Sequence, residues 1–270
     1  MRKVLIANRG EIALRAINVA RRSGILSVAV YTEADQRSKH VFAADDAVCI
    51  GASSSRETYL NIHLLVHIAC ATGCDAVYPG YGFLSENPDF VHACENAGLN
   101  FIGPSVETLI TMGDKSAARK CALEAGVPVV DGSQQACDTL KDARDSADSI
   151  GYPVLIKAVA GGGGKGIRIA TSPECFDSEF NVARRESEAA FGSSSLYLER
   201  YLADVRHVEI QIFGDGSGRA VSLGERDCSL QRRHQKLIEE SPSPVLDAHT
   251  RDAMCEKAVS LAQNLNQLHL

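Results

Sequence analysis

The sequence predicts an α/β protein whose first part is built on a parallel sheet and whose second part is α+β. In the first part, short apolar segments alternate with amphipathic helical segments, a spacing that favours a parallel sheet with right-handed crossovers. In the second part, polar and apolar residues alternate in segments beside tight glycine turns, as in antiparallel strand pairs. The chain has 270 residues, 45% of them hydrophobic and 23% charged, enough for one large domain or two small ones with a real core.

The first part contains a regular series of strands and helices. Gly24 ends the first helix of this series. Asn61 can cap a helix that ends at Gly73, and Pro88 fits the first turn of a helix that ends at Gly98. We expect strands over 3–7, 27–32, 47–50, 76–78 and 101–102, and helices over 11–23, 61–73 and 88–98.

The second part follows a boundary that we predict near residue 112, so that the domains are 1–112 and 113–270. Its glycine-rich run 214–218 is typical of a hairpin turn between two strands. We expect helices over 115–126, 138–150 and 173–190 and from near Thr250, and strands over 152–160, 167–170, 196–201, 207–213 and 220–224.

Charge and apolar run length argue against two kinds of partner. Lys and Arg number 28 against 34 Asp and Glu, a formal charge of −6, so the chain does not attract nucleic acid by bulk charge. No apolar run approaches the ~20 residues that span a bilayer, and the N-terminus resembles a first strand rather than a signal peptide. We therefore expect a cytoplasmic protein that binds neither nucleic acid nor membrane.

The nine cysteines form no CxxC pair, which argues against a disulfide framework. Most lie in apolar segments, as Cys49, Cys121 and Cys175 do. Cys70 and Cys74 are spaced to share one face of a helix. We expect these thiols to be small buried hydrophobic groups.

A glycine-rich segment is the strongest local signal for chemistry. It has lysines at 157 and 165 and glycines at 161–164 and 166. Backbone N–H groups in such a run can approach an anion closely, and the run can also act as a lid. The strand expected after it does not fit a dinucleotide-binding turn, and Gly166 stands where a Walker A loop needs Ser or Thr. A flexible linker remains the alternative.

Two further segments carry ionisable groups that could bind an anion. Lys157 lies in an apolar strand, where an ammonium group needs a paired anion, and phosphate oxygens would serve. Lys115 by itself is typical of a surface lysine. The segment 224–236 ends with Gln231, His234 and Lys236, an amide, an imidazole and an ammonium group that could hold a small anion such as bicarbonate. An exposed charged turn is the alternative for this segment.

Taken together, these motifs resemble the biotin carboxylase family, the ATP-grasp component of biotin-dependent carboxylases. The blocks that carry the resemblance occur in the family's order: Asn8–Ala13, Tyr78–Asn87, Phe101–Pro104, Met112–Lys115, the glycine run, Arg206–Gln211 and Glu225–Lys236. Tyr78 stands where the family usually has His. The resemblance implies a Rossmann-like N-terminal domain (pre-ATP-grasp) over 1–112. It also implies an incomplete ATP-grasp domain over 113–270, with a lid subdomain over about 130–203.

The resemblance also implies a reaction and a set of site residues. The family uses ATP with Mg²⁺ or Mn²⁺ to activate bicarbonate as carboxyphosphate, and then carboxylates biotin on a carrier protein that also serves a carboxyltransferase. By matching position, the residues that contact nucleotide would be Lys115, Lys157, Gly161, Gly162, Gly163, Gly164, Lys165, Gly166, Glu199, Leu202, His207, Gln231 and His234. Lys236 would hold bicarbonate, with Gln231 and His234 beside it in the catalytic site. Family likeness further suggests a homodimer.

The resemblance stops short at one point. The family's metal-binding glutamates and its catalytic glutamate and arginine belong to a part that this sequence does not contain, so we expect no metal ligand within 1–270. The chain is therefore expected to be an incomplete part of the enzyme, with little or no carboxylation on its own. A catalytically inactive ATP-binding or partner-binding module is the alternative. A nicotinamide dehydrogenase is disfavoured, because the turn after the first strand offers one glycine, Gly10.

Overall fold

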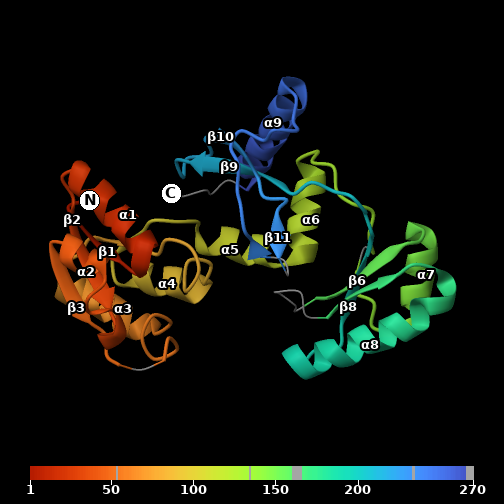
Figure 1. Ribbon diagram of the computed structural model, residues 1–270, viewed down its shortest axis with the longest axis horizontal. Helices are drawn as coiled ribbons and strands as arrows, with labels where there is room; N and C mark the ends of the chain where they lie inside the picture. Colours follow the sequence, from red (N-terminus) through yellow and green to blue (C-terminus); the bar gives the residue numbers. More distant parts are fainter. Residues whose placement is uncertain (53, 134, 160–165, 233–234, 266–270) are drawn as a thin grey trace. The chain divides into compact units, whose positions relative to one another are not determined.

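The computed structural model describes residues 1–52, 54–133, 135–159, 166–232 and 235–265 (Figure 1). Internal contacts divide the chain into two compact units. The first unit comprises Met1–Gly113 with Phe213–Ala220, and the second comprises Asp114–Ile212 with Val221–Asn264. Within the described residues, no helix combines the length and the hydropathy needed to cross a bilayer.

The first unit is built on a parallel sheet of five strands. Its strands are β1 (Lys3–Ile6), β2 (Leu26–Tyr31), β3 (Asp46–Cys49), β4 (Ala76–Tyr78) and β5 (Asn100–Phe101). Their order is β3-β2-β1-β4-β5, and every neighbouring pair is parallel. Strands β2 and β3 are therefore added on one side of β1, and β4 and β5 on the other. This change in strand order between β1 and β4 is the arrangement of a doubly wound fold.

Helices cover both faces of this sheet. They are α1 (Gly10–Arg22), α2 (Lys39–Ala43), α3 (Ile62–Ala71), α4 (Pro88–Asn96) and α5 (Val106–Gly113), with a 3₁₀ turn over Glu33–Asp35. Ile17 of α1 packs with Val4 and Ile6 on one face, whereas Leu65 and Phe90 pack with Leu5 in the core of the other face. The Asn61 side chain accepts the Leu64 N–H and so caps α3.

The second unit contains a three-stranded antiparallel sheet covered by two helices. The strands are β6 (Val154–Ala158), β7 (Ile167–Ala170) and β8 (Leu196–Arg200), in the order β7-β6-β8. Helices α7 (Leu140–Ile150) and α8 (Pro173–Phe191) supply apolar side chains to the core beneath it, including Phe176 and Phe180. Alternate residues of β6 are fully buried, so Lys157 lies on the half-exposed face.

Four further strands and two helices lie wholly or mainly in the second unit. β9 (Val208–Gly214) pairs with β10 (Ala220–Asp227), and the short strands β11 (Gln231–Arg232) and β12 (Gln235–Lys236) form an antiparallel pair. Helix α6 (Lys115–Glu124) precedes the three-stranded sheet, and α9 (Ala248–Asn264) follows the short strands. The β11–β12 pair positions Gln231 opposite Lys236.

The predicted fold class is confirmed, whereas several local expectations differ. A parallel sheet with helical crossovers precedes an α+β part, as expected. Helices α2 and α5 were not predicted. α2 is only five residues long, and α5 follows Gly103 and Pro104, which are typical of a turn.

The cysteine prediction was wrong at several positions. Cys49 and Cys70 are exposed, and Cys121 and Cys175 are only partly buried. Cys49 ends the edge strand β3, and Cys70 follows the buried positions Ile68 and Ala69 of α3, so both thiols face away from the core. Cys74 is buried but lies beyond the end of α3.

Candidate functional site

Lys157 has an anionic partner within the chain. Its ammonium group forms an ion pair with the Glu199 carboxylate on β8, and both side chains are about three-quarters buried, at 27% and 25% exposed. Lys157 lies opposite Tyr197 in the β6–β8 ladder, so Glu199 is its diagonal neighbour on the same face. The anion expected for the lysine is thus supplied by the protein in this structure, and a bound phosphate would share the ammonium group with Glu199.

The glycine-rich segment lies between two paired strands, as expected. β6 and β7 are antiparallel, with Lys157 opposite Ile167. Gly166 has a φ of +68°, and a Cβ there would stand 3.1 Å from the Ala158 Cβ. A side chain at this position would therefore be strained in backbone conformation and crowded against Ala158. The remaining predicted members, Gly161 to Lys165, lie outside the described residues.

His207 and Gln231, predicted to line the nucleotide, lie side by side. The Gln231 Nε2 is 3.0 Å from the His207 Nδ1 and also donates a hydrogen bond to the Cys228 carbonyl at 3.0 Å. An amide N–H donates to Nδ1 only when that nitrogen is unprotonated, so the contact favours the His207 tautomer with its proton on Nε2. Two residues 24 positions apart thus form one polar pair.

Lys236 is held by a glutamate that the sequence analysis did not assign. Its ammonium group donates to the Glu209 carboxylate, and this hydrogen bond raises the pKa of Lys236. Arg226 donates to the other Glu209 oxygen at 2.5 Å. Partial burial raises the pKa of Glu209, but the hydrogen bonds from Lys236 and Arg226 outweigh it and the pKa is lowered. Glu209 therefore stays ionised and keeps Lys236 charged.

Signals for this glutamate were present in the sequence. His207, Glu209 and Gln211 alternate along one face of a predicted strand, an unusual run of polar groups. Arg226 donates hydrogen bonds to the side chains of Glu209 and, at 3.0 Å, Gln211. Two of the three residues on this face thus bind the same arginine. The pairing itself depends on cations from a later strand and was not readable from the alternation.

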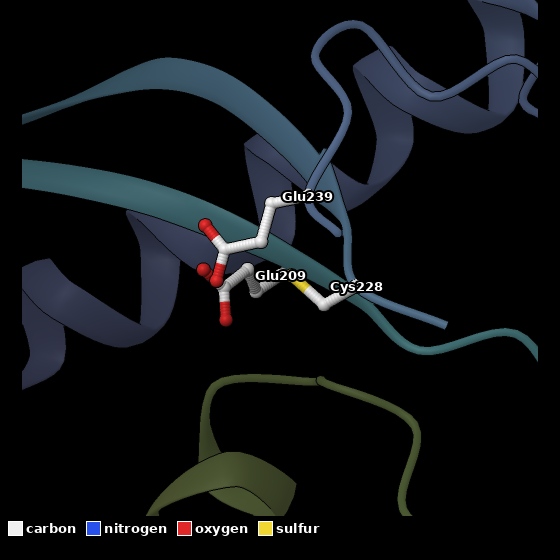
Figure 2. Close-up of side chains that lie close together, drawn as sticks. All are labelled: Glu209, Cys228 and Glu239. Atoms are coloured by element: carbon white, nitrogen blue, oxygen red, sulfur yellow. The ribbon is translucent and has the colours of Figure 1, made fainter. Parts of the chain in front are cut away.

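Glu209, Cys228 and Glu239 approach one another in the same region (Figure 2). Three potential metal-ligand atoms of these residues lie within 4.8 Å of one another. Glu239 also lies 3.9 Å from Arg226 and 3.7 Å from Lys236, so two carboxylates face two cations. Burial raises the pKa of the Cys228 thiol, which disfavours the thiolate that a metal needs. The charges therefore favour an ion-pair network over a cation site.

The other predicted site residues are placed only in part. Lys115 begins α6, but its side chain lies outside what the structure describes. His234 lies outside the described residues altogether. Leu202 follows β8 and is 47% exposed, so its apolar surface is accessible in this structure.

Two family models match the chain. The biotin carboxylase N-terminal domain matches residues 1–109. The ATP-binding domain of the carbamoyl-phosphate synthase L chain matches residues 114–268. Together the two models cover almost the entire sequence.

Curated relatives agree with these models. The chain is 50% identical over 263 residues to biotin carboxylase 1 of Bacillus subtilis strain 168, covering 97% of this chain and 58% of that protein. It is 51% identical to the mitochondrial methylcrotonoyl-CoA carboxylase subunit alpha of Oryza sativa subsp. japonica, covering 97% of this chain and 35% of that subunit. The chain thus spans well under two-thirds of the relatives it matches.

Solved structures show the same likeness. A biotin carboxylase–βγ-ATP complex from Campylobacter jejuni superposes with a TM-score of 0.91 at 45% identity, covering 98% of this chain and 59% of that one. The biotin carboxylase domain dimer of Hydrogenobacter thermophilus 2-oxoglutarate carboxylase, solved with MgADP, ADP and bicarbonate, has a TM-score of 0.90 at 43% identity, covering 98% of this chain and 58% of that one. From the matching models, sequences and structures, we conclude that this chain belongs to the biotin carboxylase family.

Proposed function

We propose that this chain carries the nucleotide- and bicarbonate-binding part of a biotin carboxylase. In the complete enzyme, a bicarbonate oxygen would attack the γ-phosphorus of ATP, releasing ADP and forming carboxyphosphate. The carboxyl carbon would then bond to N1 of biotin on a carrier protein as its bond to the phosphate oxygen breaks, and the N1 proton would leave with the released phosphate. Such chemistry depends on positioning the reactants and neutralising moving charge.

Each predicted residue has a role in this proposal. Lys157, with Lys115 and the glycine segment 161–166, would bind the phosphates, while Glu199 and Leu202 would flank the adenine. His207 and Gln231, with His234, would bind the ribose and phosphate region. Lys236 would hold bicarbonate through its ammonium group, which Glu209 keeps protonated. We also propose the domain limits 1–112 and 113–270, with the lid over about 130–203.

Mg²⁺ bound to the nucleotide would neutralise phosphate charge. We assign none of the described residues as its ligand, because Arg226 and Lys236 already balance Glu209 and Glu239. The carrier protein, a carboxyltransferase and a homodimeric state belong to the same proposal. A cytoplasmic location stays a prediction, because relatives such as the rice subunit carry a mitochondrial name and others a chloroplastic one.

The contact between His207 and Gln231 carries this proposal. Gln231 also lies opposite Lys236 in the β11–β12 ladder, so three residues chosen for nucleotide and bicarbonate binding are linked by one side-chain contact and one strand pair. The C. jejuni and H. thermophilus neighbours were solved with nucleotide, which supports a nucleotide at the corresponding part of this chain.

Calorimetric titration of the 270-residue chain with ATP tests the proposal. We expect measurable binding, and Lys157→Met should weaken it about 10- to 100-fold, because one charge-assisted hydrogen bond to phosphate is lost. Lys141→Met is the matched control, since Lys141 is an exposed lysine on α7 of the same unit. Absence of binding, or equal losses in the two variants, would contradict the proposal.

A second assay separates an enzyme part from an inactive ATP-binding module. Bicarbonate-dependent ATP cleavage is measured for the chain alone and with a separately expressed C-terminal segment of the B. subtilis relative. We expect cleavage to require the added segment and to be lost in Lys236→Met. ATP binding without cleavage in either condition would favour the inactive module.

A further inference from the structure

The hairpin that carries Gln231 and Lys236 is closed at its base by the backbone of Asp227, a buried acidic residue. Asp227 ends β10 and is 5% exposed. Its backbone pairs with Glu240 through two hydrogen bonds of 2.8 and 3.0 Å, and the Leu237 N–H donates to the Leu230 carbonyl at 2.9 Å. Residues beyond this base therefore lie on two strands whose register starts at Asp227.

The Asp227 side chain binds two serines. Its Oδ1 accepts the Ser229 hydroxyl at 2.6 Å and the Ser229 N–H at 3.0 Å, and its Oδ2 accepts the Ser243 hydroxyl at 3.1 Å. These hydrogen bonds lower the pKa of Asp227, and the bond from the Ser229 hydroxyl contributes most. The carboxylate is therefore an ionised acceptor. Both of its oxygens are therefore committed to the protein.

The Ser229 hydroxyl links the Asp227 carboxylate to the backbone of His207. A carboxylate only accepts, so the Ser229 hydroxyl must donate its single proton to Asp227 and present its lone pairs elsewhere. The His207 N–H donates to this Oγ at 2.9 Å. The Cys228 N–H in turn donates to the His207 carbonyl at 2.7 Å. The backbone of His207 is thus fixed on both sides by the start of the hairpin.

The same turn holds the Gln231 side chain. Gln231 Nε2 donates to the Cys228 carbonyl at 3.0 Å while it contacts the His207 ring at 3.0 Å. His207 itself is exposed, so packing does not hold its ring in place. Its position relative to Gln231 depends on these hydrogen bonds and on the backbone contacts of His207 with Ser229 and Cys228.

We propose that Asp227 and Ser229 are positioning residues, which fix the backbone of His207 through the Ser229 hydroxyl and so hold its ring against Gln231. Neither residue is given a contact with the nucleotide in the function proposed above. Their effect on ligand binding rests on the function proposed above, whereas their effect on His207 geometry does not. The positioning role can therefore be tested by one measurement that needs no ligand and by another that uses ATP.

Two serine variants test the positioning role. Ser229→Ala and Ser243→Ala each remove one hydroxyl that donates to Asp227, but only Ser229 bridges to His207. Ser243 is 3% exposed, so its loss disturbs the fold at least as much. These variants are compared by NMR of the ¹⁵N-labelled chain. We expect Ser229→Ala to speed hydrogen exchange of the His207 backbone amide at least about tenfold and to change the ¹⁵N chemical shifts of the His207 ring nitrogens. Ser243→Ala should give exchange rates and shifts close to those of the wild type.

ATP titration of the same variants gives the second readout. We expect about threefold to tenfold weaker binding in Ser229→Ala and wild-type affinity in Ser243→Ala. Asp227→Asn should remain close to wild type, because its amide oxygen can still accept from Ser229 and its NH₂ can donate to the Ser243 hydroxyl. Asp227→Leu should lose the order at His207, and if it fails to fold, the serine pair decides.

The outcomes separate the two proposals. Unchanged His207 exchange in Ser229→Ala, or equal effects of the two serine variants, overturns the positioning role whatever the nucleotide does. A wild-type chain that binds no ATP overturns the proposed function, and the exchange rates still decide the positioning role.

Discussion

Each unit contains a carboxylate with cationic neighbours, and the two are held very differently. In the first unit, Asp35 is 7% exposed and accepts hydrogen bonds from the Arg9 Nε at 2.7 Å, the Tyr59 hydroxyl at 2.9 Å and the Thr32 hydroxyl at 3.3 Å. In the second unit, Glu209 is 26% exposed and is bound by the side chains of Arg226 and Lys236, each about one-third exposed.

The difference separates a structural polar cluster from a candidate binding site. Ligands of doubly wound sheets commonly bind where the strand order reverses, at the carboxyl ends of strands such as β1 and β4. In this chain Asn8 donates to the carbonyls of Pro79 and Tyr81 at 2.7 and 3.0 Å, and so ties the ends of these two strands together. The Lys236 side chain, in contrast, is about one-third exposed. Density of polar residues alone thus does not mark a site; accessibility and exchangeable partners do.

Matched amide substitutions of the two carboxylates should give the largest difference in stability between the units. Asp35→Asn turns an acceptor oxygen toward Arg9 into a donor within a buried cluster, and we expect a loss of about 2–4 kcal/mol in the free energy of unfolding. Glu209→Gln makes the same change in a half-buried group and should cost about 0–1 kcal/mol. Urea unfolding followed by probes in each unit measures both values. Equal losses would show that the two carboxylates are structurally equivalent.

Acid should act on the first unit through the same carboxylate. The hydrogen bond from Arg9 is the largest cause that holds the pKa of Asp35 below its ordinary value of 3.8. Because the fold favours the ionised form, this stabilisation is fully present above that value and is lost as the pH falls through the lowered folded-state pKa. Thermal unfolding between about pH 5 and pH 2 should therefore show a decline that is shallower in Asp35→Asn. An identical slope in the variant would assign acid sensitivity to other groups.

Much of the fold could be predicted because its signals are local. Apolar runs, the cap of α3, Pro88 in the first turn of α4 and terminal glycines indicated the parallel sheet from short stretches of sequence. Helix α5 was missed because Gly103 and Pro104 before it are typical of a turn, and because β-branched residues such as Thr108 have low helix propensity.

Candidate site residues could be named one by one from the sequence, but their pairing could not. Lys157 stood out because an ammonium group is unusual in an apolar strand, yet its partner Glu199 is 42 positions away and depends on the β6–β8 register. Glu209 received no role, because its cations come from later strands. Side-chain types can be read along a chain, whereas pairing requires the tertiary arrangement.

Two buried tyrosines, one in each unit, should show a smaller difference in stability. Tyr59 is 2% exposed, donates to Asp35 and accepts the Thr32 N–H at 3.2 Å, and burial raises its pKa to about 12. Tyr197 is 5% exposed, and within the described part of the chain its hydroxyl has no hydrogen-bond partner. We expect Tyr59→Phe to cost about 1–2 kcal/mol and Tyr197→Phe to change stability by less than about 0.5 kcal/mol. Chemical unfolding of the two variants measures this, and a larger loss at Tyr197 would contradict the contrast.

Alkali should produce the smallest effect, on the second unit. The Glu209 hydrogen bond raises the pKa of Lys236 above its ordinary value of 10.5. The pair therefore stabilises the fold fully below that value, and its contribution disappears as the pH rises through the raised folded-state pKa. Since Lys236 is 34% exposed, the loss should be about 0–1 kcal/mol and should shrink with added salt. NMR titration of the Lys236 side chain should give a lower pKa in Glu209→Gln than in wild type. An unchanged pKa would mean that Glu209 does not keep this lysine charged, and the role given to Lys236 in holding bicarbonate would lose its electrostatic support.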